Sequence, residues 1–451
     1  MPTSLTPNEI EGTFETLRVA NQQFALDYPG DSEKRQPVHT VYGGAQIFKS
    51  DTAQKLGAAA LKSLNEYAPN AGIFARALGL NVSTKLQKKI YERVVAKLRT
   101  EPVEDFRIDF EDGYGNRTDA EEDGHAEFCA REVAKGMANH SLPPYVGMRV
   151  KPFTQELKAR AIRTLDIFIT TLLQQSGGTL PGNFVVTIPK VVDPRQISAL
   201  VELLRVLERA TGLDDGSLKL EFMVETPQAI FNHRGEVPLP LFVEAAQGRC
   251  VAAHFGVYDY TASNNITSKY QSMVHPAADF ARTVMKVSLA GTGVWISDGA
   301  TNVMPVGPHR ANEGKKLTAK ERSENRTLVH RVWRLNFAHI NHSLMQAFYQ
   351  GWDLHPAQFP VRYAATYNFF LAELEATSVR LKTFVEKAAQ ASLIGEVFDD
   401  AATGQGLLNF FLRGIGCGAI TEQEALATGL TVDEIRSRSF VKILSTRSGR
   451  Y

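Results

Sequence analysis

Short apolar runs alternate with amphipathic segments along most of the chain. Helical spacing is clearest where apolar residues recur every four positions, as at Leu86, Ile90, Val94 and Leu98. A second such series comprises Ile197, Leu200, Leu204 and Leu207. Apolar runs of about four to eight residues between the helical segments predict buried strands. The strands that this pattern predicts are 38–43, 106–111, 145–150, 184–190, 219–225, 251–257, 293–297 and 352–354.

Eight strands separated by helices favour a closed barrel over an open sheet. An α/β chain with this alternation is typical of the (β/α)8 TIM barrel. We expect an N-terminal helical segment over 1–36, a TIM-barrel catalytic domain over 37–363 and a C-terminal helical extension over 364–451. The fold class predicted is therefore α/β, with helical additions at both ends.

Capping residues mark helices outside the barrel. Thr6 fits an N-cap followed by Pro7 at the first helical position, and the helix is expected to run to about Leu26. In the C-terminal extension, the glycine-containing segment 404–406 predicts a break, and Thr421 is expected to cap a further helical segment.

Composition excludes several classes of partner. The chain has 50 Lys and Arg residues against 49 Asp and Glu residues, so no net charge favours nucleic acid or an anionic membrane. Three scattered cysteines indicate a reducing compartment and predict neither a disulfide framework nor a zinc cluster. We find no secretory signal in residues 1–12, and no segment approaches the roughly 18 apolar residues of a membrane helix. A cytoplasmic protein is expected.

Acidic residues gather where three predicted strands end. The segment 106–113 reads Phe-Arg-Ile-Asp-Phe-Glu-Asp-Gly, and two later apolar runs end on Glu225 and Asp259. Carboxylates this dense are costly in a barrel unless a cation or a buried partner offsets them. They predict a site for Mg²⁺ or Mn²⁺ held by Glu225 and Asp259, near Glu111 and Asp112. The alternative is that each acid caps a helix or forms a salt bridge.

Two basic residues lie at the C-terminal ends of other predicted strands. Arg149 can hold a carboxylate or enolate with two parallel hydrogen bonds, and it can also pair with the acids at 111 and 112. Lys190 provides a second positive group; a Schiff base is its less favoured role, and pairing with an acid is the structural alternative.

With these residues placed, the chain resembles the HpcH/HpaI aldolase and citrate lyase beta-subunit superfamily. Six matching segments follow the order of that family's motifs, at 108–112, 148–150, 189–190, 225–226, 259–260 and 354–358. The resemblance implies a TIM barrel, a divalent cation and carbon–carbon bond chemistry through a metal-bound oxo acid or its enolate. The citrate lyase branch usually has an arginine entering its first strand, whereas this chain reads Val38-His39-Thr40 there. Tyr258 stands where an acid often precedes the aspartate. These departures leave the use of coenzyme A open.

The sequence thus predicts a magnesium-dependent carbon–carbon lyase (aldolase), or the reverse condensation, that acts on a small 2-oxo acid or an acyl-CoA through a metal-stabilised enolate. Arg149 and Asp109 are expected to bind the substrate, Glu111 or Asp112 to move a proton, and Lys190 to orient those acids. A homo-oligomer is expected. Three alternatives stay open: a malate-synthase-like condensation of acyl-CoA with glyoxylate, an enzyme that handles phosphoenolpyruvate, and a non-catalytic metabolite-binding barrel.

Overall fold

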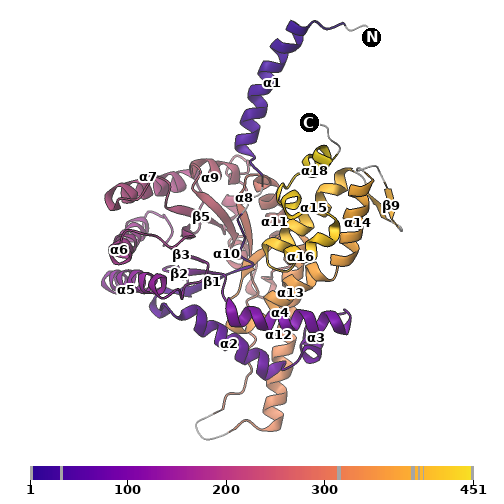
Figure 1. Ribbon diagram of the computed structural model, residues 1–451. Helices are drawn as coiled ribbons and strands as arrows, with labels where there is room; N and C mark the ends of the chain where they lie inside the picture. The colour runs from indigo at the N-terminus through magenta and orange to yellow at the C-terminus, as the bar shows by residue number, and fades with distance from the viewer. Residues whose placement is uncertain are drawn as a thin grey trace.

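A closed barrel of eight parallel strands forms the centre of the protein, as seen in a computed structural model that describes residues 4–30, 34–311, 316–387, 392–394, 397–399 and 401–447 (Figure 1). The strands follow one another around the barrel in sequence order, and β8 pairs with β1. They are β1 (His39–Gly44), β2 (Asp105–Asp109), β3 (Tyr145–Arg149), β4 (Phe184–Ile188), β5 (Lys219–Val224), β6 (Cys250–Phe255), β7 (Trp295–Ala300) and β8 (Gln350–Trp352). The predicted (β/α)8 barrel is confirmed.

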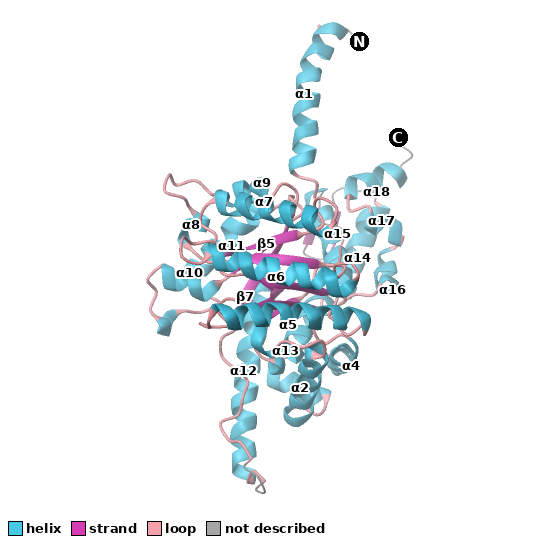
Figure 2. Cartoon of the chain, turned by 90° about the vertical axis from the view of Figure 1, so that its left-hand side faces the viewer, coloured by secondary structure: helices cyan, strands magenta, loops and turns pink. Residues whose placement is uncertain are grey.

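Helices surround the strands on the outside of the barrel (Figure 2). The α-helices are α1 (Pro7–Asp27), α2 (Thr52–Tyr67), α3 (Ala71–Leu78), α4 (Thr84–Thr100), α5 (Asp119–Ala138), α6 (Lys158–Ser176), α7 (Pro194–Thr211), α8 (Pro227–Ile230), α9 (Leu239–Ala245), α10 (Val257–Ser263), α11 (Pro276–Leu289), α12 (Ala319–Met345), α13 (Phe359–Leu371), α14 (Leu374–Glu386), α15 (Ala401–Gly416), α16 (Glu422–Ala425), α17 (Val432–Arg436) and α18 (Phe440–Arg447). The short 3-10 helices are η1 (Ala45–Ile47), η2 (Ser268–Tyr270), η3 (Pro356–Gln358) and η4 (Leu426–Thr428), and β9 (Ser392–Ile394) and β10 (Val397–Asp399) form a small antiparallel hairpin.

Helix α4 shows how local sequence produces the outer layer. Ser83 caps the helix by accepting a hydrogen bond from the backbone N–H of Leu86, with 3.3 Å between donor and acceptor. Ile90, Val94 and Leu98, spaced four residues apart, are all buried against the core. Burying one apolar stripe in this way stabilises a barrel helix more than its intrinsic helical propensity does. The helix predicted from this spacing is therefore confirmed.

Several strands are shorter at their C-terminal ends than the apolar runs indicate. Strand β2 ends at Asp109, so Glu111 lies in the following loop. Strand β6 ends at Phe255, and Val257 already begins helix α10. Apolar character continues past each strand because residues beyond its end are also buried, as Phe110 after β2 and Val257 after β6 are. The acids thus lie just beyond the strands, at the C-terminal mouth of the barrel.

The helical extension differs from its prediction in places. Helix α15 runs through the expected break at 404–406 without interruption. A Cβ atom on Gly404 would lie 2.5 Å from Phe384 and 2.8 Å from Phe440, so this glycine permits close packing of aromatic rings. Thr421 caps α16 in a capping box with Glu424, as predicted. The expected boundary between 363 and 364 falls within the continuous helix α13.

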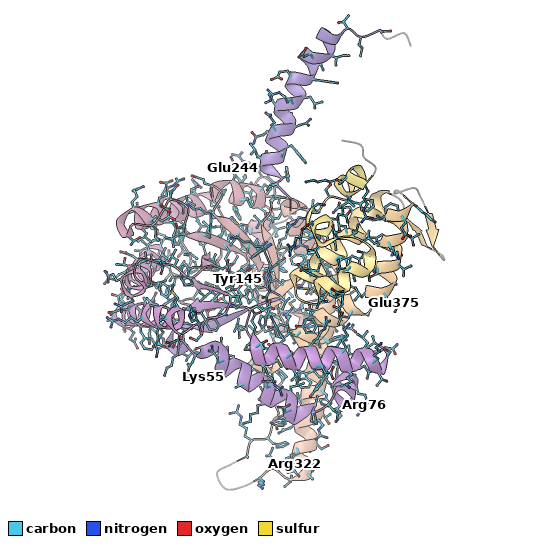
Figure 3. The ribbon with its side chains drawn as sticks, in the orientation of Figure 1. Lys55, Arg76, Tyr145, Glu244, Arg322 and Glu375 are labelled. Atoms are coloured by element: carbon cyan, nitrogen blue, oxygen red, sulfur yellow. The ribbon has the colours of Figure 1, made fainter. Side chains whose placement is uncertain are left out.

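Helix α1 projects from the body of the protein, and its side chains extend outward on all sides (Figure 3). By contrast Tyr145, at the start of β3, lies near the middle of the molecule in the same view. Several apolar residues of α1 are exposed, among them Phe14, Leu17 and Phe24. Among the described residues, none of the helices combines the length and apolar character needed to cross a membrane.

Candidate active site

Charged side chains from five neighbouring strands converge at the C-terminal mouth of the barrel. Asp109 and Arg149 end β2 and β3, and Asp259 lies in the first turn of α10, after β6. The other members of this group lie in the loops that directly follow β2, β4 and β5, and they are Glu111, Asp112, Lys190 and Glu225. TIM barrels place their chemistry at this end of the strands.

Arg149 is held by a fork of hydrogen bonds to Asp109. Its Nε atom donates to Oδ1 at 2.7 Å, and its Nη2 atom donates to Oδ2 at 2.6 Å. The same carboxylate accepts the backbone N–H groups of Glu111 and Gly113 at 2.9 and 2.7 Å. Burial alone would lower the pKa of Arg149, but the charge and hydrogen bonds of Asp109 raise it well above its usual range. Asp109 thereby fixes a permanently charged guanidinium that lies 4.8 Å from the ring centre of Tyr42.

Lys190 connects the acids of the mouth. Its ammonium group contacts Glu111, lies 3.1 Å from both carboxylate oxygens of Asp112 and is 3.8 Å from Asp259. Burial alone would lower the pKa of Lys190, but Glu111 and Glu225 raise it above its usual value. The backbone of Lys190 has a φ of +51°, a left-handed conformation that costs on the order of 1–3 kcal/mol in a non-glycine residue. This conformation directs its backbone N–H to Glu225, 3.0 Å away.

Glu225 is the most deeply buried acid of the loops. Only 1% of the residue is exposed, and Gly256 leaves the space that its carboxylate occupies. A Cβ atom at position 256 would lie 2.6 Å from Oε1 of Glu225, so a larger residue would displace the carboxylate. Burial, together with the charges of Asp259 and Glu111, raises the pKa of Glu225 to about 8 despite Arg149 and Lys190. The two basic groups therefore compensate its charge only in part.

The other acids differ in how well they are compensated. Burial raises the pKa of Glu111, although Arg149 lies 3.0 Å from its Oε2 atom and Lys190 contacts Oε1. Burial also raises the pKa of Asp259, with a further contribution from Asp112. Burial acts on Asp112 in the same direction, but Lys190 and Arg149 outweigh it and hold the pKa of Asp112 below its usual value.

The donor set fits a hard divalent cation. Mg²⁺ is usually held by one or two carboxylates, and water and substrate complete its octahedral shell. Within the described part of the chain, no group of three or more His, Cys, Asp or Glu side chains is arranged to hold a metal by itself. Glu225 and Asp259 would supply two ligands and leave the remaining positions open. The raised pKa of Glu225 supports this fit, because a cation would compensate the charge that Arg149 and Lys190 do not.

The structure brings all of the expected site residues to one mouth, while their individual roles stay predictions. Sequence reasoning missed two contributors, Tyr42 beneath Arg149 and Gly256 beside Glu225. Their signals were weak: an aromatic residue in the first apolar run, and a glycine three residues before Asp259. His39, in the first-strand segment that lacks an arginine, is buried, and its Nδ1 atom lies 2.7 Å from Oδ2 of Asp353.

Several solved structures are similar to this chain. Citrate lyase from Burkholderia xenovorans LB400 superposes with a TM-score of 0.56 at 16% identity, covering 88% of this chain and 97% of that chain. Malate synthase from Haloferax volcanii, in a lead(II) complex, has a TM-score of 0.48 at 13% identity, covering 93% and 99%. CitE from Mycobacterium tuberculosis, in complex with magnesium, acetoacetate and coenzyme A, has a TM-score of 0.46 at 12% identity, covering 86% and 100%. At 16% identity, the likeness to citrate lyase is a likeness of fold.

Among curated proteins, no sequence matches this chain. A family model described as a domain of unknown function, DUF6986, matches residues 17–443. Because that match covers most of its length, the chain belongs to the DUF6986 family.

Proposed function

We propose that this protein is a divalent-metal-dependent carbon–carbon lyase, or the corresponding condensing enzyme, acting on a small 2-oxo acid or an acyl-CoA. Membership of the HpcH/HpaI aldolase and citrate lyase beta-subunit superfamily is part of the proposal. The main observation in support is that Glu225, Asp259 and the fixed guanidinium of Arg149 lie near one another at the C-terminal mouth of the barrel. The ordered motifs and the fold likeness to citrate lyase also support it.

Arg149 is the proposed substrate anchor. Its guanidinium is held rigidly by Asp109, so it can meet a carboxylate without losing conformational freedom at each turnover. Its Nη1 atom is the guanidinium nitrogen that Asp109 does not contact, and it lies 3.0 Å from Oε2 of Glu111. A positive group placed where negative charge grows lowers the barrier by electrostatic stabilisation. In this arrangement Asp109 is a positioning residue, while its expected share in substrate binding stays a prediction.

A bound Mg²⁺ or Mn²⁺ at Glu225 and Asp259 would supply Lewis-acid polarisation of the substrate's carbonyl and carboxylate oxygens. The chain's own contribution is to hold these two carboxylates near each other, with Glu225 buried and Asp259 partly exposed at the mouth. Glu225 is fixed by the backbone N–H of Lys190 and by the space at Gly256. Such preorganisation removes the need to reorder ligands during the reaction.

Glu111 is the better candidate to move a proton. Burial raises its pKa, whereas the pKa of the half-exposed Asp112 lies below its usual value. A carboxyl group whose pKa is shifted toward neutrality exchanges a proton more readily at physiological pH. Lys190 contacts Oε1 of Glu111 and would orient that carboxylate toward the substrate.

The role of Lys190 follows from its surroundings. Three acids lie within 4 Å of its ammonium group, and they favour the protonated form. A Schiff base requires a neutral amine, so these contacts disfavour covalent catalysis. We therefore assign Lys190 to positioning and charge balance.

Proton NMR provides the test of this function. The purified protein would be incubated with pyruvate, glyoxylate and oxaloacetate, and with pairs of these acids and acyl-CoAs, with and without Mg²⁺. We expect carbon–carbon bond cleavage or formation for at least one substrate or pair, only with the cation present, and its loss in Glu225→Gln. Turnover that is unchanged without divalent cation, or in Glu225→Gln, would contradict the proposal.

A further inference from the structure

Helix α1 carries a regular row of residues along one side, which we call the seam. Its six positions are separated alternately by four and three residues, and they are Ile10, Phe14, Leu17, Asn21, Phe24 and Tyr28, which follows the last helical residue. Residues three and four positions apart lie on the same face of a helix. This alternation is the spacing of the inward-facing positions of a coiled coil. Five of the six residues are apolar or aromatic, and Asn21 is polar.

The seam faces solvent. Phe14, Leu17 and Phe24 are 59%, 52% and 64% exposed, and every residue of 11–29 is exposed. The rings of Phe24 and Tyr28 lie 4.9 Å apart, so the end of the seam forms one aromatic surface. In proteins, most of the stability of a helix comes from packing of its apolar face. Within the described part of the chain, the seam is left without such packing.

The opposite side of α1 has no comparable row among its described side chains. Val19 and Leu26 lie there seven residues apart, and Gln22 and Gln23 stand between them in the sequence. Single exposed apolar residues of this kind are common on protein surfaces. The seam, by contrast, continues over about five helical turns. The helix therefore presents one face that suits a partner.

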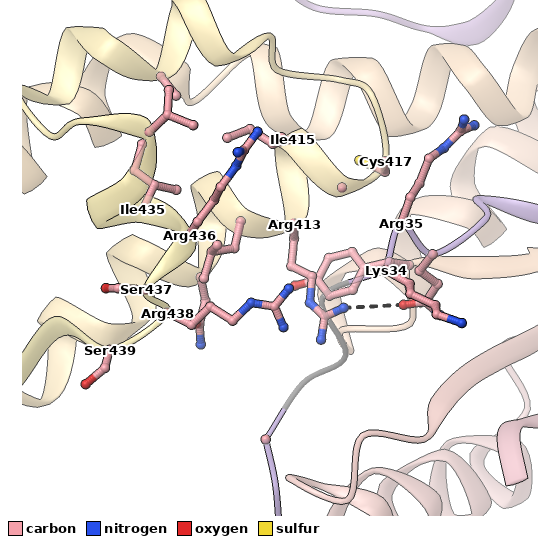
Figure 4. A pocket seen from close by; sticks show the side chains of 18 of the residues that line it. Lys34, Arg35, Arg413, Ile415, Cys417, Ile435, Arg436, Ser437, Arg438 and Ser439 are labelled. Atoms are coloured by element: carbon pink, nitrogen blue, oxygen red, sulfur yellow. Dashed lines mark hydrogen bonds between the residues drawn. The ribbon is translucent and has the colours of Figure 1, made fainter. Parts of the chain in front are cut away.

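The base of α1 is fixed to the body of the protein, from which the helix projects (Figure 1). The backbone N–H of Gly30 donates to the carbonyl of Gly291, in the loop after α11, at 2.8 Å. Farther along the chain, Gln36 accepts a hydrogen bond from Arg413 of α15 at 3.4 Å (Figure 4). These contacts hold the chain on both sides of residues 31–33. The seam is thus carried on an arm with a fixed origin.

The charge of α1 disfavours a membrane as the partner of the seam. The helix contains one basic residue, Arg18, which pairs with Glu15. Against it stand four acidic residues, which are Glu9, Glu11, Glu15 and Asp27. Helices that lie on membrane surfaces are rich in Lys and Arg on their polar face. An anionic lipid surface would therefore repel this helix.

A second copy of the same helix fits the seam in spacing and in area. An enclosed aromatic side chain buries about 150–250 Å². Each copy contributes three of them, and this brings the pair to the scale of a specific interface, about 1,200 Å². A single Asn within a seam specifies how many helices assemble, at a cost in stability, and this is the place of Asn21.

We propose that α1 pairs with α1 of a second copy as a two-stranded coiled coil and so makes the protein a dimer. The homo-oligomer expected from the sequence would then rest on a defined element. The interface is separate from the candidate active site and does not depend on the proposed function.

Sedimentation equilibrium of the full-length protein tests this pairing. We expect the wild type to have twice the mass of the 49.8 kDa chain at micromolar concentration. Leu17→Glu places a charge in the seam and should weaken association at least tenfold. Leu26→Glu introduces the same side chain on the opposite side of α1, so it serves as the matched control and should leave association unchanged. Asn21→Leu makes the seam apolar throughout and should tighten association.

Two further measurements complete the test. Melting curves followed by circular dichroism should show that the body of each variant stays folded, because the substituted residues are exposed. Vesicles of phosphatidylcholine and phosphatidylserine should not sediment the protein. A monomeric wild type, whether or not it binds vesicles, would overturn the proposal. The same holds for an assembly that survives Leu17→Glu, for equal weakening in Leu17→Glu and Leu26→Glu, and for association in Asn21→Leu no tighter than in the wild type.

Discussion

Two buried glutamates, one on β5 and one just after it, are surrounded by different balances of charge. Glu221 lies within the barrel and Glu225 lies just beyond the strand, four residues later. Both are almost fully buried, at 0% and 1% exposure. Their pKa values nevertheless shift in opposite directions, far below the usual range for Glu221 and up to about 8 for Glu225. Burial is common to both residues, so the neighbouring charges make the difference.

Neighbouring groups compensate the negative charge of Glu221. Burial alone would raise its pKa, but Arg107 donates to both of its oxygens, at 2.8 and 2.9 Å, and His254 lies 3.3 Å away. Thr187 donates a further hydrogen bond at 2.5 Å. Asp105 also contacts Arg107, so one guanidinium links two barrel acids. This interior cluster has the composition of a structural ion-pair network.

The mouth of the barrel is unbalanced by comparison. Two basic groups, Arg149 and Lys190, face five carboxylates, which are Asp109, Glu111, Asp112, Glu225 and Asp259. An arrangement that leaves acids under-compensated is costly for stability and favours binding of a cation. The comparison teaches that burial alone does not decide the direction of an acid's pKa shift; the balance of the neighbouring charges does.

The largest expected difference between Glu225 and Glu221 is in how the stability of the protein depends on pH. In metal-free protein, the folded-state pKa of Glu225 lies above its unfolded value, so the folded state holds the proton between about pH 5 and 8. Stability should therefore fall as pH rises through this window, by up to roughly 5 kcal/mol at about 1.4 kcal/mol per unit of pKa shift. Urea denaturation across pH measures this loss. Glu225→Gln should flatten the slope, and an equally steep slope in that variant would contradict the assignment.

Glu221→Gln should instead destabilise the protein throughout the neutral range. The substitution leaves Arg107 buried with one acidic partner fewer, and breaking a buried pair typically costs about 3–5 kcal/mol. Because the folded pKa of Glu221 is lowered, its stabilising contribution is present above the unfolded pKa and is lost only as pH falls below it. Denaturation at pH 7 measures the effect. A loss well under 1 kcal/mol would show that the interior cluster is not a stabilising network.

Arg149→Lys should reduce turnover more than it reduces folding. Lysine keeps the positive charge but loses the fork that Asp109 orients. Removal of one preorganised donor at a developing negative charge commonly lowers kcat about 10²- to 10³-fold. Steady-state kinetics with the substrate found by NMR, beside a melting curve, separates the two effects. Turnover equal to that of the wild type would reduce Arg149 to a structural partner of the acids.

The smallest effect is expected from borohydride treatment in the presence of substrate. Lys190 contacts Glu111 and Asp112 and has a raised pKa, so it should remain protonated and form no imine. Intact-mass spectrometry should then show no stable adduct. A mass increase that maps to Lys190 would replace the metal-assisted mechanism with a Schiff-base one.

The sequence predicted the barrel because eight apolar runs alternate with helical periodicity, and because short strands and amphipathic helices are local patterns. It predicted the cluster of acids at the C-terminal mouth because these acids directly follow the apolar runs. The exact ends of strands were not predictable, since a buried residue beyond a strand, such as Val257 at the start of α10, is as apolar as a strand residue. Gly404 was mistaken for a break because its packing partners, Phe384 and Phe440, are distant in sequence.

The sequence also could not show how the charge of each acid is balanced by its neighbours. Glu221 and Arg107 lie on β5 and β2, and only closure of the barrel brings them together. Alternation of Asp105, Arg107 and Asp109 with apolar residues does indicate that these side chains share the inner face of β2. It does not indicate which partner each one meets. That pairing is what separates the structural glutamate from the candidate ligand.

Magnesium titration of three proteins by calorimetry tests the central claim most directly. Glu225→Gln and Glu221→Gln remove the same charge at two buried positions on and just after β5, and the wild type is the reference. We predict that the wild type binds Mg²⁺, that Glu225→Gln weakens binding at least tenfold, and that folded Glu221→Gln binds as the wild type does. Unchanged binding in Glu225→Gln, or equal weakening in both variants, would contradict the account.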